Sequence, residues 1–140
     1  MRNSILLALA LIGITLINSI QAQTSIDSNK NNYFVLTRNV SQLKPIILAA
    51  EELAKNDGEH FGEYQVVICG KTVSDLTDEI IMNDLVKMAE VHHVKLFACG
   101  FSLQKFNVEE RELPEQVQVV ENGILYGFEL EKRGFYAITL

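Results

Sequence analysis

The sequence has 140 residues, of which 48% are hydrophobic and 21% are charged, and its formal net charge at pH 7 is −6. This length suits one domain with a substantial core. The acidic balance, without any basic run, argues against binding to nucleic acid or to an anionic membrane surface. The two cysteines, Cys69 and Cys99, are too few to form a disulfide framework.

The first 22 residues have the features of an export signal. Arg2 supplies a positive charge, residues 5–17 form an apolar run, and Ala22 is a small residue suited to cleavage. The run is shorter than the roughly 20 residues of a spanning helix, so we expect a cleaved signal peptide over residues 1–22. The mature protein is then periplasmic or secreted, without membrane association, and disulfides are permitted in that compartment. Polar residues 23–32 are expected to form a flexible leader.

Residues 33–140 are expected to form a single α/β domain, because apolar runs of strand length alternate with helical patterns. The expected strands cover residues 33–37, 64–69, 95–98, 117–120 and 135–140, the fourth with the partial polarity of an edge strand. Every connection is long enough for a crossover. The pattern therefore predicts a three-layer α/β/α sandwich, with a five-stranded parallel sheet covered by helices on both faces.

Four helices are expected between these strands. The first has Ser41 as a candidate N-cap and Pro45 in its first turn, and it ends near Gly58. The second follows the capping side chains of residues 74–78, and a short third helix starts at about Ser102. The fourth opens at residues 122–123 and ends with Gly134 at the C′ position.

Cys99 is the candidate catalytic residue. Ligands bind beyond the carboxyl ends of the strands in an open parallel sheet, and Cys99 lies there, at a strand-to-helix turn. Unpaired backbone amides and the helix dipole at such a turn favour the thiolate over the thiol. Arg38, Lys71 and Gly100 are the candidate groups for stabilising that thiolate or an anionic sulfur species. The alternative is that Cys99 is a small buried core residue.

Cys69 is a possible second thiol. It ends the second expected strand, where it could equally continue a buried core. If the second and third strands are neighbours, Cys69 and Cys99 end at the same level and could form a disulfide. The sequence leaves both possibilities open.

Other motifs predict neither a cofactor nor a metal. Residues 70–72, Gly-Lys-Thr, mimic the end of a phosphate-binding loop, but Gln65 stands where the first glycine of that motif is required. The spacing of the three histidines does not resemble a metal site. A Gly-rich dinucleotide fingerprint does not follow the first strand.

Several segments together resemble the DsrE/DsrF-like family of small sulfur-relay proteins. They are Val67-Ile68-Cys69-Gly70, the Ala-Cys-Gly turn within Phe97-Ala98-Cys99-Gly100, and the closing pattern of Val119-Val120, Gly123 and Gly134-Phe135-Tyr136. The resemblance implies a strand order of 4-3-2-1-5 and assembly into homo-trimers or hexamers. It also implies a cysteine that carries a persulfide, and only Cys99 matches the family's cysteine. Phe101 departs from the family, where a polar residue often follows Cys-Gly, and Cys69 lies outside the shared pattern.

The leading hypothesis is therefore an exported sulfur carrier or weak sulfurtransferase. Cys99 would take a sulfane sulfur from a donor and pass it to an acceptor thiol, without a cofactor. The alternative is a non-catalytic, oligomeric binding or scaffold domain in which both cysteines are structural. Thiol–disulfide exchange through Cys69 and Cys99 ranks third, because the Cys-X-X-Cys spacing that tunes redox enzymes is missing.

Overall fold

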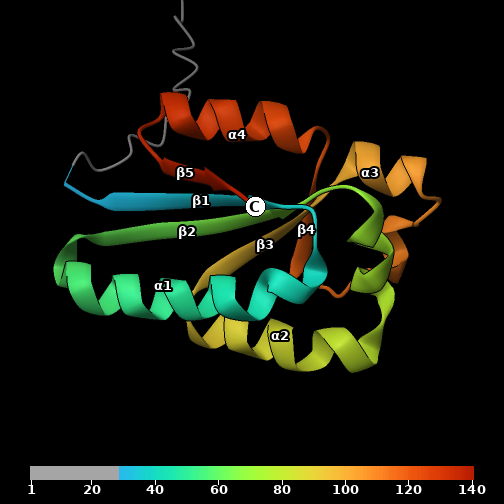
Figure 1. Ribbon diagram of the computed structural model, residues 1–140, viewed down its shortest axis with the longest axis horizontal. Coiled ribbons are helices and arrows are strands. Elements are labelled where there is room, and N and C mark those ends of the chain that lie inside the picture. Colours follow the sequence, from blue (N-terminus) through green and yellow to red (C-terminus); the bar gives the residue numbers. More distant parts are fainter. Residues whose placement is uncertain (1–28) are drawn as a thin grey trace, which may run out of the picture.

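Five parallel strands form the central sheet of the structure, a computed structural model that describes residues 29–140. The strands are β1 (Asn31–Thr37), β2 (Phe61–Ile68), β3 (Val94–Cys99), β4 (Val117–Val120) and β5 (Tyr136–Thr139). Their order is β4-β3-β2-β1-β5, and every neighbouring pair is parallel (Figure 1). The expected strand order is confirmed. The signal peptide expected over residues 1–22, and residues 23–28 of the expected leader, lie outside the described residues.

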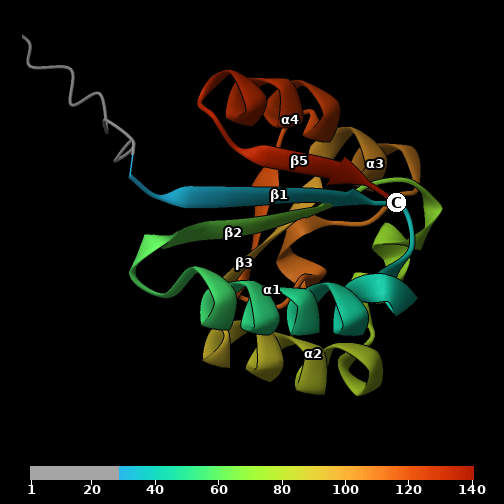
Figure 2. The same ribbon diagram turned by 60° about the vertical axis from the view of Figure 1, so that its left-hand side comes forward.

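Helices cover both faces of the sheet, which confirms the three-layer sandwich. Helices α1 (Leu43–Asp57) and α2 (Glu79–Val91) lie on one face, and α4 (Gly123–Lys132) lies on the other (Figure 2). The short α3 (Gly100–Lys105) follows β3 directly. In the part of the chain that is described, no helix combines the length and the apolar character needed to cross a membrane.

The sheet separates two apolar clusters of unequal size. The larger lies on the α1 and α2 side and includes fully buried Leu43, Ile47 and Val66. The smaller lies under α4 and contains both cysteines. The aromatic and aliphatic side chains packed with them are Phe34, Leu36, Val67, Phe97, Leu130 and Phe135. The cysteines are therefore on the face of the sheet that α4 covers.

The boundaries of several elements differ from those expected. Strand β1 begins at Asn31, inside the segment expected to be a leader, because buried Asn32 accepts a 2.8 Å hydrogen bond from the Glu63 amide through Oδ1. A 3-10 turn at Val40–Gln42 precedes α1, and its cap is the side chain of Asn39, not Ser41. Gly134 has φ +89° directly after the C-cap of α4, as expected for a C′ glycine.

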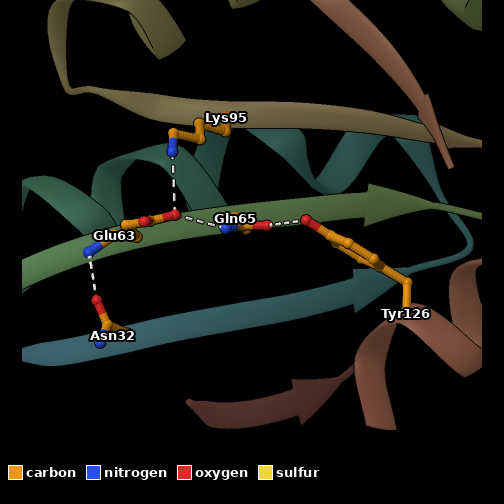
Figure 3. A network of polar contacts seen from close by, with 5 residues as sticks. All are labelled: Asn32, Glu63, Gln65, Lys95 and Tyr126. Carbon is orange, nitrogen blue, oxygen red and sulfur yellow. Dashed lines mark hydrogen bonds and ion pairs between the residues drawn. The ribbon is translucent and has the colours of Figure 1, made fainter. Parts of the chain in front are cut away.

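A chain of polar side chains ties α4 to the sheet (Figure 3). The Tyr126 hydroxyl donates a 2.6 Å hydrogen bond to Oε1 of buried Gln65, whose Nε2 donates a 2.6 Å bond to Oε2 of Glu63. The same Glu63 oxygen lies 3.0 Å from Nζ of Lys95. Because a buried amide without partners is costly, this network favours one position of α4 over the sheet.

Candidate functional site

The two cysteines lie side by side at the carboxyl ends of neighbouring strands. The β2–β3 register pairs Ile68 with Ala98, so Cys69 and Cys99 occupy the next positions of the two strands. Both are free thiols, and only 8% of Cys69 and 5% of Cys99 is exposed. Each thiol also shifts the pKa of the other. The sheet thus brings together the candidate catalytic residue and the possible second thiol.

Two glycines one helical turn apart let α4 lie directly on this pair. An ideal Cβ on Gly123 would be 2.7 Å from Sγ of Cys69 and 2.7 Å from Cγ1 of Val67. One turn later, a Cβ on Gly127 would be 2.8 Å from the Phe34 ring. A side chain at either position would force the helix or the contacted side chains to shift. The glycine pair therefore sets the close approach of the N-terminus of α4 to the sulfur atoms.

The N-terminus of α4 is directed at Cys99. The Asn122 side chain caps the helix by accepting hydrogen bonds from the amides of Ile124 (3.0 Å) and Leu125 (3.2 Å). The amide of Gly123 is left free to donate a buried hydrogen bond of 3.4 Å to Sγ of Cys99. An amide donor at the positive end of a helix dipole stabilises a thiolate.

The pKa of Cys99 lies below the usual value for a thiol. Burial alone would raise it, but the hydrogen bond from the Gly123 amide acts in the opposite direction. The hydroxyl and the amide of Ser102, and the thiol of Cys69, add to that lowering, and together these donors outweigh burial. Cys99 is therefore the thiol of the pair that ionises first.

The pKa of Cys69 shifts the other way, to about 12. Burial is the main cause, and the charge of Cys99 and the hydrogen bond to it add to the rise. The positive charge of Arg38 opposes the shift. The site is thus an unequal pair, with the more acidic thiol at Cys99 and the less acidic thiol beside it at Cys69.

The structure places the three candidate stabilising groups differently. Arg38 is exposed and lies against Gly70, with its Nε 3.3 Å from where a Cβ of that residue would be, so its charge acts on Cys69. Lys71 is also exposed, at the start of the 3-10 segment Lys71–Thr77. Gly100 is the first residue of α3, where a Cβ would be 3.2 Å from the carbonyl oxygen of Glu121. Its visible role is close packing of α3 against the loop before α4.

Ser102 and Gly123 belong to the candidate site, although the sequence reasoning did not select them as site residues. Ser102 lies in α3, and its hydroxyl accepts a 2.8 Å hydrogen bond from the amide of Gly70, which joins the turn after β2 to α3. The serine one turn after Cys99 was a signal for this role. For Gly123, the signal was the spacing of four residues to Gly127 within an otherwise apolar helix.

Cavities lie at the β5 edge of the sheet and beside α2. An apolar groove of about 310 Å³ runs between α4 and the β1–β5 edge, and its lining includes Phe34, Leu36, Phe128 and the charged Arg38. A larger cavity of about 560 Å³ lies beside α2 and residues 111–116. Among residues 29–140, no group of three or more His, Cys, Asp or Glu side chains is arranged to hold a metal ion.

Solved structures with a similar fold include two proteins of unknown function. One is a protein of unknown function, MTH1491, from Methanobacterium thermoautotrophicum, with a TM-score of 0.66 and 19% identity over 79% of this chain and 99% of that one. The other is a conserved protein of unknown function, BT1422, from Bacteroides thetaiotaomicron, with a TM-score of 0.60 and 17% identity over 79% of this chain and 95% of that one. At these identities the similarity extends to the fold alone. No protein-family model matches the sequence, and no curated protein matches it.

Proposed function

We propose that this protein is a sulfur carrier of the DsrE/DsrF type, in which Cys99 holds a persulfide. The observation that carries the proposal is the 3.4 Å hydrogen bond from the Gly123 amide to Sγ of Cys99, at the N-terminus of α4. That donor, together with Ser102, keeps the pKa of Cys99 below its usual value although the residue is buried. A thiolate is the form of cysteine that attacks sulfur.

The transfer requires two displacements at sulfur. The Cys99 thiolate attacks the sulfane sulfur of a donor persulfide or polysulfide, a new S–S bond forms to Sγ, and the remainder of the donor leaves as a thiolate. The thiolate of an acceptor then attacks the outer sulfur and takes it, which returns Cys99 to the thiolate form. Amide donors that stabilise the Cys99 thiolate also stabilise it as the leaving group of the second step.

Export and assembly are parts of the same proposal. Residues 1–22 support a cleaved signal, so the mature chain of exported protein should begin at Gln23. Exposed apolar side chains on α4, Ile124, Leu125 and Phe128, and on the edge strand β5, Tyr136 and Ile138, support a homo-oligomer. N-terminal sequencing tests the first point. Light scattering of the wild type and of Phe128→Glu tests the second, and a wild type that is monomeric at high concentration contradicts it.

The decisive experiment measures sulfur uptake and transfer. Reduced wild type, Cys69→Ser and Cys99→Ser are exposed to polysulfide, freed of excess donor, analysed by intact mass and peptide mapping, and mixed with an acceptor thiol. We expect the Cys69→Ser variant to gain one sulfur atom at Cys99 and to pass it on, and the Cys99→Ser variant to do neither. Failure of folded wild type and folded Cys69→Ser to take up sulfur overturns the proposal.

A non-catalytic binding or scaffold domain is the second candidate. Burial of both cysteines and the exposed apolar surface of α4 and β5 favour it. It requires that neither thiol reacts with iodoacetamide unless the chain is unfolded, and that replacing either cysteine destabilises the fold. The carrier requires that Cys99 is alkylated under native conditions. Alkylation mapped by peptide mass separates the two candidates.

A further inference from the structure

The carrier mechanism leaves Cys69 without a role. This thiol is buried next to Cys99 on the neighbouring strand, and both sulfur-bearing side chains lie under the same residue, Gly123. An ideal Cβ on Gly123 would be 2.7 Å from Sγ of Cys69 and 3.4 Å from Cβ of Cys99, so the two side chains are neighbours under α4. A second thiol in contact with a persulfide-bearing cysteine can displace the outer sulfur.

We propose that Cys69 resolves the persulfide on Cys99, releasing hydrosulfide and leaving a Cys69–Cys99 disulfide, so that the protein reduces sulfane sulfur. This inference rests on the proposed function, because it starts from the Cys99 persulfide. It adds an outcome for the bound sulfur: release as sulfide instead of transfer to an acceptor thiol.

The step balances without another reactant. Sγ of Cys69 attacks Sγ of Cys99, the Cys69–Cys99 bond forms, and the bond between Cys99 and the outer sulfur breaks. The outer sulfur leaves as hydrosulfide, and the proton from the Cys69 thiol appears on it or in solvent. The sulfane sulfur gains two electrons, and the two cysteine sulfurs supply them. Return to the dithiol state requires a dithiol reductant, which exchanges its own thiols for the disulfide.

The geometry suits a disulfide between these positions. Neighbouring strands of a sheet lie about 4.7–4.9 Å apart, and disulfides join Cα atoms that are about 4.4–6.8 Å apart. The cysteines occupy matching positions at the strand ends, beyond the last paired residues Ile68 and Ala98. Closure at this point therefore leaves the β2–β3 ladder in place.

The electrostatics order the two steps. While Cys99 is a thiolate, its charge helps to hold the pKa of Cys69 high, so Cys69 stays protonated and does not compete for the donor. Once Sγ of Cys99 is bonded to a second sulfur, that charge is no longer on Sγ. Arg38 then favours ionisation of Cys69. Uptake at Cys99 comes first, and attack by Cys69 follows.

A single-turnover experiment tests the inference. Fully reduced protein is exposed to polysulfide without reductant, and intact mass, non-reducing peptide maps and released sulfide are followed over time for wild type, Cys69→Ser and Cys69→Ala. Circular dichroism verifies the fold of each variant. We expect wild type to lose two hydrogens, to form the Cys69–Cys99 peptide pair and to release one sulfide per chain. Both Cys69 variants should instead keep a persulfide at Cys99.

The outcomes separate this inference from the proposed function. If wild type and the Cys69 variants all keep a stable persulfide and release no sulfide, the resolving role is wrong and the carrier remains. If none of the folded proteins takes up sulfur, both proposals fall.

The rate of sulfide release in Arg38→Gln is a further test, because this rate would not change if Cys69 had only a structural role. Sulfide release should slow several-fold while sulfur uptake keeps its rate, because Arg38 acts on Cys69. Arg111→Gln, at an exposed arginine paired with Glu109, is the matched control and should leave both rates unchanged. Equal rates of sulfide release in Arg38→Gln and wild type would count against the ordered attack by Cys69.

Discussion

The hydroxyl of Tyr126 donates a 2.6 Å hydrogen bond to Oε1 of Gln65, which joins the middle of α4 to the middle of β2. The Tyr126 ring also packs against Phe97, with ring centroids 5.4 Å apart. Both contacts lie on the face of the sheet that carries the thiols, one turn beyond Gly123. Tyr126 therefore holds the helix whose first amide reaches Cys99.

Replacing Tyr126 by Phe should destabilise the protein by about 1–3 kcal/mol, because buried Gln65 loses a hydrogen-bond partner while the ring packing remains. Urea unfolding measures the loss. A shift in the pH profile of Cys99 alkylation should accompany it, as α4 loosens over the sulfur. Unchanged stability and an unchanged profile would show that the aromatic packing alone positions α4.

Gly123→Ala should cost about 1–3 kcal/mol and raise the pKa of Cys99, because the new methyl group meets Cys69 Sγ and Val67 at 2.7 Å. The matched variant is Gly127→Ala, in the same helix, whose methyl group meets the Phe34 ring instead. We expect similar destabilisation in both and the larger pKa change in Gly123→Ala. Rates of iodoacetamide alkylation measured against pH give the pKa of Cys99 in each variant. Equal pKa changes would mean that the helix moves as a whole, without a specific role for the Gly123 amide.

Ser102→Ala should raise the pKa of Cys99 and cost about 1 kcal/mol, because the Gly70 amide loses the acceptor of its 2.8 Å hydrogen bond. Ultraviolet titration of the thiolate in a Cys69→Ser background isolates Cys99. Ser74→Ala, at a serine whose hydroxyl donates to the Lys71 carbonyl, is the control and should not alter the titration. A Cys99 pKa that is the same in all three proteins would remove Ser102 from the site.

Stability should decline as the pH rises above about 9, because Cys69 and Tyr64 hold their protons in the folded state up to a pKa of about 12. In the unfolded chain the pKa values of these groups are the usual 9.0 and 10.0. Their contribution to the stability of the fold is therefore complete below pH 9 and is lost as the pH approaches 12. Cys99 has the opposite sign: its lowered pKa adds stability above the usual thiol value, and that stability is lost as the pH falls through the folded-state pKa.

Cys69→Ser and Tyr64→Phe should each flatten this alkaline decline. Urea midpoints measured at a series of pH values test the prediction. If the wild type and both variants follow parallel curves, deprotonation of these two groups does not limit alkaline stability.

The main outline of the fold followed from the sequence because the buried strands are continuous apolar runs. Residues 95–98 were expected as a strand, and β3 is Val94–Cys99. The first residue of β1 was predicted wrongly, because Asn31 and Asn32 are polar. Their place in β1 depends on the hydrogen bond between Asn32 and the Glu63 amide of the neighbouring strand. Such contacts depend on a register that periodicity alone does not specify.

Part of the site was also predictable. Position at a strand-to-helix turn selected Cys99, and the order 4-3-2-1-5 from the family resemblance brought Cys69 next to it. The donors that lower the Cys99 pKa were not selected, because one of them, the Gly123 amide, is a backbone group on a helix far along the sequence. Its reach depends on the packing of α4, which two glycines and the partly buried Tyr126 determine, and that packing is a tertiary effect.

The crossing of α4 over the cysteines has a consequence for how the site forms during folding. Both cysteines precede α4 in the sequence. The last strand, β5, pairs with β1 across about a hundred residues of chain, so this pairing is expected to form late. A chain folded only through β4 would hold both sulfur atoms at the carboxyl ends of β2 and β3, without the Gly123 amide and without α4 covering them. In such an intermediate Cys99 lacks the Gly123 donor and both thiols are less well covered, so docking of α4 both completes the set of donors around Cys99 and protects the pair from oxidants.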